Sequence, residues 1–316
     1  RNAILEAMNF AAGQFLSQAS LNESIQNTIQ RFAEATRVSR VYLFKNQPFT
    51  GNKSYATQTH EWVADGIEPQ IDNPSLLQFC YEDAGYTRWR DLLSQGALIH
   101  GKTTSFPQEE YELLASQDIR SILVVPIFVG KRWWGFMGFD DCWNAEREWL
   151  DAEREALRTA AALVGNGLMR QQIEDELRES ELKFRSVISQ SVDGITLTDQ
   201  NGILIEWNHG QETITGLKRE EVLGRPIWET MMQIAAPGRK SPEMLEGARQ
   251  SVLEILQNPQ ANWPGMSSTH HIHRPDGSQR LMQSTSFLIV TAQGVMLGGS
   301  SRDITNEKEA EMRLRD

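Results

Sequence analysis

The longest regular pattern in the chain is helical and spans residues 146–190. This stretch lacks proline and is rich in Ala, Leu, Glu, Arg and Gln, which are good helix formers. One apolar stripe at helical spacing consists of Leu157, Ala161, Val164 and Leu168. A second stripe, out of phase with the first, consists of Ile173, Leu177, Phe184 and Val187. The pattern predicts a helix of about 40 residues, roughly 60 Å long, that packs first on its own domain and then on a partner helix. The alternative is two surface helices joined at Gly165 and Gly167.

Shorter patterns divide the rest of the chain into two series of elements. The first series consists of helices at 1–18 and 20–37, strands at 40–44 and 55–64, an irregular stretch at 66–86, a helix at 106–114, and a hairpin of strands 119–128 and 133–140. The second consists of a hairpin of strands 194–198 and 203–207, short helical pieces over 208–229, a helix at 242–257, and strands at 266–273, 280–290 and 295–302. These series predict an α+β protein with two antiparallel sheets joined by the long helix.

Composition narrows the class of protein. The 316 residues suggest about two domains. The net charge is −11 and the basic residues are dispersed, which argues against a nucleic-acid groove. No apolar run approaches the roughly 20 residues that span a bilayer, so we expect no membrane insertion. Cys80 and Cys142 have neither metal-ligand spacing nor a disulfide pattern, which fits the reducing cytoplasm. We also expect both ends to be cut from a longer protein, with any effector domain outside this chain.

The first series resembles the GAF family. The resemblance rests on residues 121–127 (SILVVPI), 134–141 (WGFMGFDD) and 147–149 (REW), and it covers about 19–168. The family usually caps the next helix with Ser or Thr; this chain has Leu150 there, so Asp151 is expected to cap one residue later.

The GAF resemblance implies a cavity between the sheet and its covering loops. Bilin attachment in related photoreceptors needs Cys followed by His, but Tyr81 follows Cys80 and Trp143 follows Cys142. Tyr81, Tyr86 and Trp89 are candidates for the wall of an apolar pocket, and core packing explains them equally well.

The second series resembles the PAS family. The resemblance rests on residues 184–188 (FRSVI), 193–195 (DGI), 199–208 (DQNGILIEWN), 220–224 (EEVLG), 275–277 (PDG) and 303–305 (DIT). It implies that Asp303, Ile304 and Thr305 pass movement from the sheet to an exit helix; the alternative is a plain helix cap. No cysteine lies beyond Cys142, which argues against a covalent flavin adduct. A non-covalent flavin or another small ligand stays open as an alternative without direct support, with Asn208 and Trp228 as candidate contacts.

These resemblances imply a sensory module without catalytic residues, metal or assigned cofactor. We divide the chain into an incoming helix (1–18), a GAF domain (19–168), a helical linker (169–183), a PAS domain (184–305) and an outgoing helix (306–316). The expected partners are an unknown small molecule and a second copy, which meets the linker through Ile173, Leu177 and Phe184. The absent effector would be a histidine kinase or a cyclic-dinucleotide enzyme. Two alternatives are a structural dimerisation module with empty pockets and a GAF-type methionine sulfoxide reductase, which needs several suitably placed cysteines.

Overall fold

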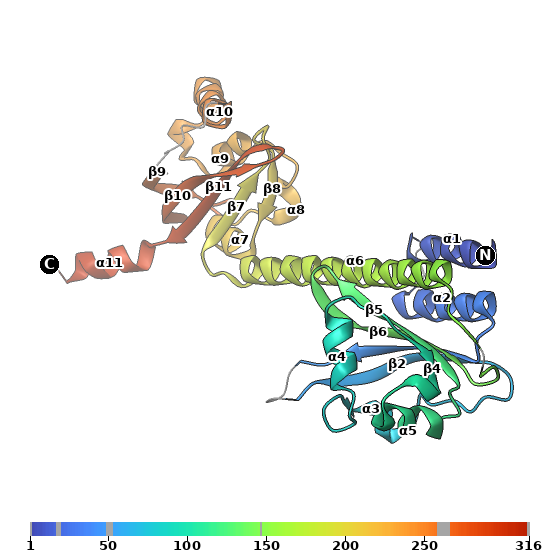
Figure 1. Ribbon diagram of the computed structural model, residues 1–316. Coiled ribbons are helices and arrows are strands. Elements are labelled where there is room, and N and C mark those ends of the chain that lie inside the picture. Colours follow the sequence, from blue (N-terminus) through green and yellow to red (C-terminus); the bar gives the residue numbers. More distant parts are fainter. Residues whose placement is uncertain (1, 17–19, 49–52, 146, 258–265, 315–316) are drawn as a thin grey trace. The chain divides into compact units, whose positions relative to one another are not determined.

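The protein divides into two compact units, each built on one antiparallel sheet (Figure 1). The computed structural model describes residues 2–16, 20–48, 53–145, 147–257 and 266–314. The units are Arg1–Leu177 and Arg178–Asp316. The predicted α+β class is confirmed.

The sheet of the first unit has six strands in the order β3-β2-β1-β6-β5-β4. The strands are β1 (Arg40–Asn46), β2 (Tyr55–Val63), β3 (Phe79–Cys80), β4 (Ile99–Lys102), β5 (Ser121–Val129) and β6 (Arg132–Asp141). The predicted β5–β6 hairpin is present. Residues 66–86 are not wholly irregular as predicted, because they contain β3 and the four-residue helix α3. Such short elements hold too few residues to show a periodic pattern.

Helices cover both faces of this sheet (Figure 1). The helices are α1 (Asn2–Leu16), α2 (Leu21–Thr36), α3 (Pro74–Leu77), α4 (Thr87–Ser94), the 3-10 turn η1 (Thr103–Ser105), α5 (Gln108–Ser116) and α6 (Asp151–Gln190). One core lies between the sheet and α1, α2 and the first half of α6. A second core, rich in aromatic rings, lies between the sheet and α3, α4 and α5. The predicted cap at Ser20 is present, since the Glu23 N–H donates to its hydroxyl over 3.3 Å.

The long helix α6 is a single helix of 40 residues, which excludes the alternative of two helices joined at the glycines. Gly165 and Gly167 are instead points of close packing. A Cβ on Gly165 would lie 2.2 Å from the carbonyl oxygen of Phe128, and one on Gly167 would lie 2.4 Å from the Phe15 ring. The expectation that Asp151 caps the helix is wrong, because Asp151 is the first residue of α6 itself. A carboxylate in the first turn still complements the helix dipole.

The second unit has five strands in the order β8-β7-β11-β10-β9. The strands are β7 (Gly194–Thr198), β8 (Leu204–Trp207), β9 (Met266–His273), β10 (Gln279–Thr291) and β11 (Gly294–Asp303). The helices are α7 (His209–Thr215), α8 (Arg219–Val222), α9 (Ile227–Ile234), the 3-10 turn η2 (Pro237–Arg239), α10 (Pro242–Gln257) and α11 (Thr305–Arg313). The predicted hairpins and helical pieces are present, and the apolar core lies between the sheet and α7, α8 and α9.

Candidate functional site

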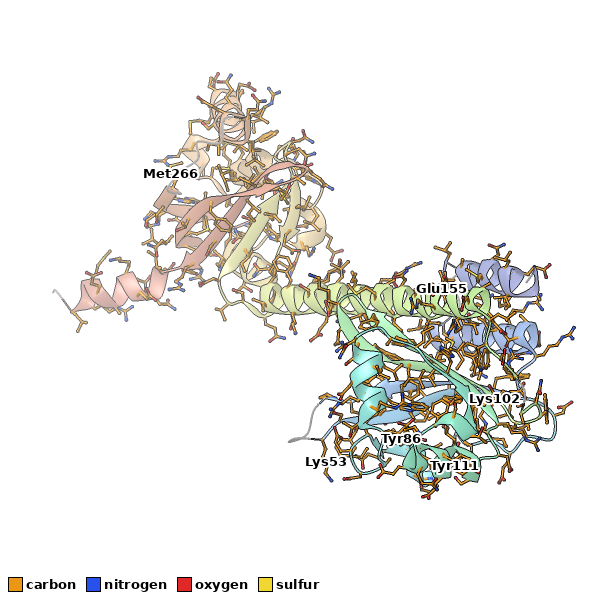
Figure 2. All side chains as sticks on the ribbon, in the orientation of Figure 1. Lys53, Tyr86, Lys102, Tyr111, Glu155 and Met266 are labelled. Atoms are coloured by element: carbon orange, nitrogen blue, oxygen red, sulfur yellow. The ribbon has the colours of Figure 1, made fainter. Side chains whose placement is uncertain are left out.

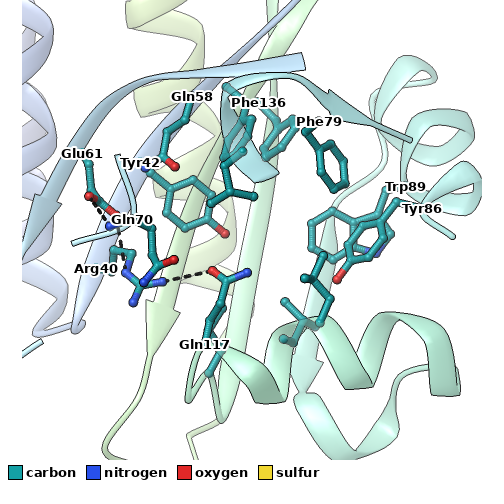
Figure 3. A pocket seen from close by; sticks show the side chains of 15 residues that line it. Arg40, Tyr42, Gln58, Glu61, Gln70, Phe79, Tyr86, Trp89, Gln117 and Phe136 are labelled. Atoms are coloured by element: carbon teal, nitrogen blue, oxygen red, sulfur yellow. Dashed lines mark hydrogen bonds and ion pairs between the residues drawn. The ribbon is translucent and has the colours of Figure 1, made fainter. Parts of the chain in front are cut away.

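The first unit encloses a small cavity between its sheet and α5 (Figure 3). Polar side chains form one end and aromatic rings the other. The polar end is centred on Arg40, the first residue of β1, which is 2% exposed. Its Nε lies 3.6 Å from the Glu61 carboxylate, and its Nη1 lies 3.6 Å from Asp140 Oδ2. Nη1 also donates to Gln117 Oε1 over 3.4 Å. These contacts are all longer than an ideal charge-assisted hydrogen bond.

Asp140 and Glu61 both have buried carboxyl groups, but they differ in the hydrogen bonds that these groups accept. Glu61 accepts the backbone N–H groups of Gln70 and Ile71 over 2.8–3.0 Å. Asp140 accepts only the Tyr42 hydroxyl, over 3.0 Å at Oδ1, and its Oδ2 has no hydrogen-bond partner among the described residues. Burial therefore raises the pKa of Asp140 to about 7, although the Arg40 charge and the Tyr42 hydrogen bond lower it.

Aromatic rings fill the other end of the cavity. Phe44 and Phe136 stack at 4.9 Å, and Tyr86 meets Trp89 edge-on at 4.7 Å. Tyr86 and Trp89 line the cavity, and Figure 2 labels Tyr86 within this unit. Tyr81 does not line it; this side chain is fully buried and donates to Asn46 Oδ1 over 2.9 Å.

Glu110 of α5 fixes the helical cover of this cavity. Its buried carboxylate accepts two hydrogen bonds from Arg88, of 2.8 and 2.6 Å, and one of 2.8 Å from Trp89 Nε1. The remaining cavity is about 50 Å³. That volume holds a few water molecules and is far below the roughly 300–1,000 Å³ of typical small-molecule pockets.

The second unit contains a larger cavity of about 630 Å³. It lies between the face of β9, β10 and β11 and the helices α7 and α9. Its apolar wall includes Trp207, Ile234 and Leu297. Four polar side chains in its lining are more than nine-tenths buried: Thr196, Gln211, Thr230 and Ser301. Among the described residues, neither Gln211 Oε1 nor Thr230 Oγ1 has a hydrogen-bond partner. Buried polar atoms are rarely left unpaired in proteins, so these two atoms are candidates for a hydrogen bond to a ligand or water.

The structure places Asn208 and Trp228 outside the lining of this cavity. The Asn208 amide caps α7 by accepting from Gln211 N–H over 2.9 Å, and it also accepts from Ile195 N–H over 2.7 Å. Its Nδ2 donates to the carbonyls of Ile188 and Asp193. Trp228 packs beside Gly202 and Val252. Both side chains therefore hold the fold together.

The predicted joint at Asp303, Ile304 and Thr305 connects β11 to α11. Asp303 Oδ1 accepts the Thr305 N–H over 3.0 Å, which satisfies the first free N–H group of α11. The Thr305 hydroxyl oxygen accepts the backbone N–H of Leu281 in β10 over 2.8 Å. Arg274 lies 3.9 Å from the Asp303 carboxylate and donates to the Ile214 carbonyl at the end of α7 over 2.8 Å. The joint thus contacts the sheet directly and is linked to α7 through Arg274.

The two apolar stripes of α6 differ in burial. Leu157, Ala161 and Val164 are fully buried in the core of the first unit. Ile173, Leu177, Phe184 and Val187 are 52–71% exposed. The inward half of the prediction is confirmed. The pairing of the second stripe with another chain stays a prediction.

The cysteines and the residue types that bind metal ions are the remaining candidates for reactive chemistry. Cys80 and Cys142 are free and buried, and burial raises the pKa of the Cys142 thiol to about 11, which makes it a poor nucleophile at neutral pH. In the part of the chain that the structure describes, no group of three or more His, Cys, Asp or Glu side chains is placed to hold a metal ion.

None of the described helices combines the length and apolar character needed to cross a bilayer.

Comparison with known families decides the identity of both units. The family model of the GAF domain matches residues 20–168, and that of the PAS domain matches residues 192–306. The chain is a GAF domain followed by a PAS domain. It is a sensory module related to histidine kinases and other sensor proteins.

Three comparisons illustrate the relationship. The chain is 36% identical over 190 residues to the methanogenesis regulatory histidine kinase FilI of Methanothrix harundinacea, covering 60% of this chain and 21% of that protein. It is 32% identical over 148 residues to sporulation kinase E of Bacillus subtilis, covering 46% of this chain and 18% of that protein. The chain therefore spans about a fifth of the length of these relatives. A phycocyanobilin-bound GAF domain from a cyanobacterial phytochrome aligns with a TM-score of 0.46 and 16% identity, over 54% of this chain and 96% of that domain.

Sequence reasoning missed the polar cluster around Arg40 and the true lining of the PAS cavity. The available signal for the first was an arginine at the start of an otherwise apolar strand and an aspartate at the end of another. For the second, the signal was a pair of serines at alternate positions of β10, Ser284 and Ser286, and a run of small residues, 298–301, in β11.

Proposed function

We propose that this module is the ligand-responsive part of a cytoplasmic signalling protein, and that the PAS cavity is its sensing site. The observation that carries the proposal is a cavity of about 630 Å³ whose lining includes two buried polar side chains with unpaired atoms. The GAF cavity, at about 50 Å³, is filled largely by its own aromatic rings. The kinship with histidine kinases supports a kinase as the effector outside this chain. The free thiols fit a reducing compartment.

Ligand occupancy has two structural routes to the exit helix. In the first, Leu297 and Ser301 of β11 line the cavity, and the same strand continues through Asp303 into α11. In the second, Gln211 lines the cavity from α7, and Arg274 joins the end of α7 to Asp303. A ligand that favours one position of β11 or α7 therefore biases the geometry at the start of α11.

A second copy of the chain completes the proposed module. The exposed stripe at Ile173, Leu177 and Phe184 has the 4-7 spacing of one helix face. Exposed apolar stripes of this kind are usually covered by another helix. Two copies of α6 that meet along this stripe would join GAF and PAS domains in one continuous dimer.

A pair of variants on one strand tests the sensing site. Ser301 of β11 is buried and lines the cavity, whereas its neighbour Ser300 is not in the lining, because alternate residues of a strand face opposite sides. Ser301→Leu should fill part of the cavity, and Ser300→Leu is the matched control. Each protein is incubated with a metabolite extract of its host, desalted and denatured, and the released small molecules are identified by mass spectrometry.

The wild-type protein and Ser300→Leu should release a compound that Ser301→Leu does not retain. Circular dichroism must show that all three proteins are folded. Identical release profiles from folded wild-type and Ser301→Leu proteins would contradict the sensing role of the cavity.

A further inference from the structure

The charges around the PAS cavity are of one sign. Among the described residues that line it, there is no Asp or Glu, although the chain as a whole carries 42 acidic and 31 basic residues. The lining includes Arg239 at the end of η2 and the neighbouring residues His270 and His271 on β9; of the two histidines, His270 is paired with another lining residue, Met282. A cavity with a guanidinium and a hydrogen-bonding imidazole but without carboxylates, in an acidic protein, favours an anionic ligand.

Arg239 is available for such a ligand. In the described structure it has no ion-pair partner, whereas Arg219, Arg249 and Arg302 of the same unit each pair with a carboxylate within 3.2 Å. Arg239 is exposed and His270 is half-buried, which places the guanidinium and this imidazole at the solvent side of the cavity. Burial lowers the pKa of His270, and the nearby charge of Arg239 lowers it further. An anion between the two groups would offset that repulsion.

The rest of the cavity suits an uncharged, largely apolar body. Trp207, Ile234, Ile272 and Leu297 are at most 7% exposed and form its apolar walls. Gln211 and Thr230 provide the deep polar contacts. One guanidinium with one adjacent imidazole matches a single negative charge, and guanidinium binds a carboxylate through two parallel hydrogen bonds.

We infer that the PAS cavity binds a small organic carboxylate, with the carboxylate at Arg239 and His270 and the apolar body against Trp207 and Leu297. This inference rests on the proposed sensing role of the same cavity. It adds the chemical class of the ligand and the residues that select it.

Four six-carbon probes that differ in the head group test the inference. Hexanoate, hexanamide, hexylamine and hexyl phosphate are titrated into the whole module by isothermal calorimetry at neutral pH. Hexanoate should bind most tightly and hexylamine least. Arg239→Gln should weaken hexanoate about fivefold, the upper range for a solvent-exposed ion pair, and leave hexanamide unchanged. Arg249→Gln, which removes an exposed arginine of α10 that is not in the lining, should change neither.

Each of the other possible outcomes would overturn a stated part of the inference. Equal binding of hexanoate and hexylamine, or equal weakening of hexanoate and hexanamide by Arg239→Gln, would overturn the charge selection. Tighter binding of hexyl phosphate would replace the carboxylate class by phosphomonoesters. If no probe binds while the wild-type protein still retains an extract compound that Ser301→Leu loses, the carboxylate inference fails and the sensing role stands. If the extract experiment also fails, both fail.

Discussion

The buried carboxyl of Asp140 should make the stability of the GAF domain fall as pH rises. Its side chain is fully buried, and the nearest cation, Arg40, is shared with Glu61 at the same distance of 3.6 Å. Burial is the main cause that raises the pKa of Asp140, from an ordinary value of 3.8 to about 7. The folded protein therefore binds this proton more tightly than the unfolded chain. The stabilisation is fully present below about pH 4 and is lost as pH rises to about 7.

The size of the effect follows from the two pKa values. One pKa unit corresponds to about 1.4 kcal/mol, so the full difference is on the order of 4 kcal/mol. Between pH 5 and pH 7, the part of the range where most proteins stay folded, the loss in the free energy of unfolding is about 2 kcal/mol.

Asp140→Asn isolates this contribution. Asparagine has the shape of the protonated acid and keeps an oxygen that can accept the Tyr42 hydroxyl, but it cannot ionise. Urea unfolding is followed by circular dichroism and tryptophan fluorescence at several pH values. From pH 5 to pH 7, the wild-type protein should lose about 2 kcal/mol relative to Asp140→Asn, with little further change above pH 8.

The exposed carboxylate Asp72 provides the control. Asp72→Asn should follow the wild-type pH profile closely. Parallel profiles of the wild type and Asp140→Asn over pH 5 to pH 8 would refute the reasoning, because they would mean that Asp140 ionises in the folded state as readily as in the unfolded chain.

Two further predictions concern α6. Gly165→Ala should lower the melting temperature of the GAF domain and destabilise it by about 1–3 kcal/mol, because the added Cβ would lie 2.2 Å from the Phe128 carbonyl oxygen. The control is Gly247→Ala in α10, where nothing lies within 4 Å of the added Cβ; calorimetry should show that it is neutral or stabilising. Equal effects of the two substitutions would refute the packing role of Gly165. Ile173→Asn combined with Leu177→Asn should shift the module from dimer to monomer in light scattering and leave its circular dichroism unchanged. The reason is that burial of each apolar side chain in the interface contributes about 1.5–3 kcal/mol. A fully dimeric variant, or a wild type that is monomeric at high concentration, would show that this stripe is not the interface.

Periodic patterns could be predicted from the sequence, and cross-strand geometry could not. The alternation in β7 to β11 and the buried stripe of α6 are visible because many residues repeat one pattern. Arg40 and Asp140 are 100 positions apart in the chain, and the antiparallel register of β1 and β6 makes them direct partners. The same register sets Tyr42 opposite Gly138, and the missing side chain leaves room for the Tyr42 ring to reach Asp140. Without the register, these four residues have no visible relation.

The PAS cavity shows a different limit of sequence reasoning. Polar and aromatic residues such as Asn208 and Trp228 attract attention as ligand contacts, yet both are used to hold the fold. The cavity arises where large side chains are missing. Ser284 and Ser286 of β10 and Ser301 of β11 occupy positions on the sheet face that α7 and α9 cover. At such positions a core normally requires large apolar residues to reach close packing. Small polar residues there leave space that the helices cannot fill. Serines at alternate positions of a strand can thus reveal a cavity once the covered face of the sheet is known, and this face is what the sequence alone leaves undetermined.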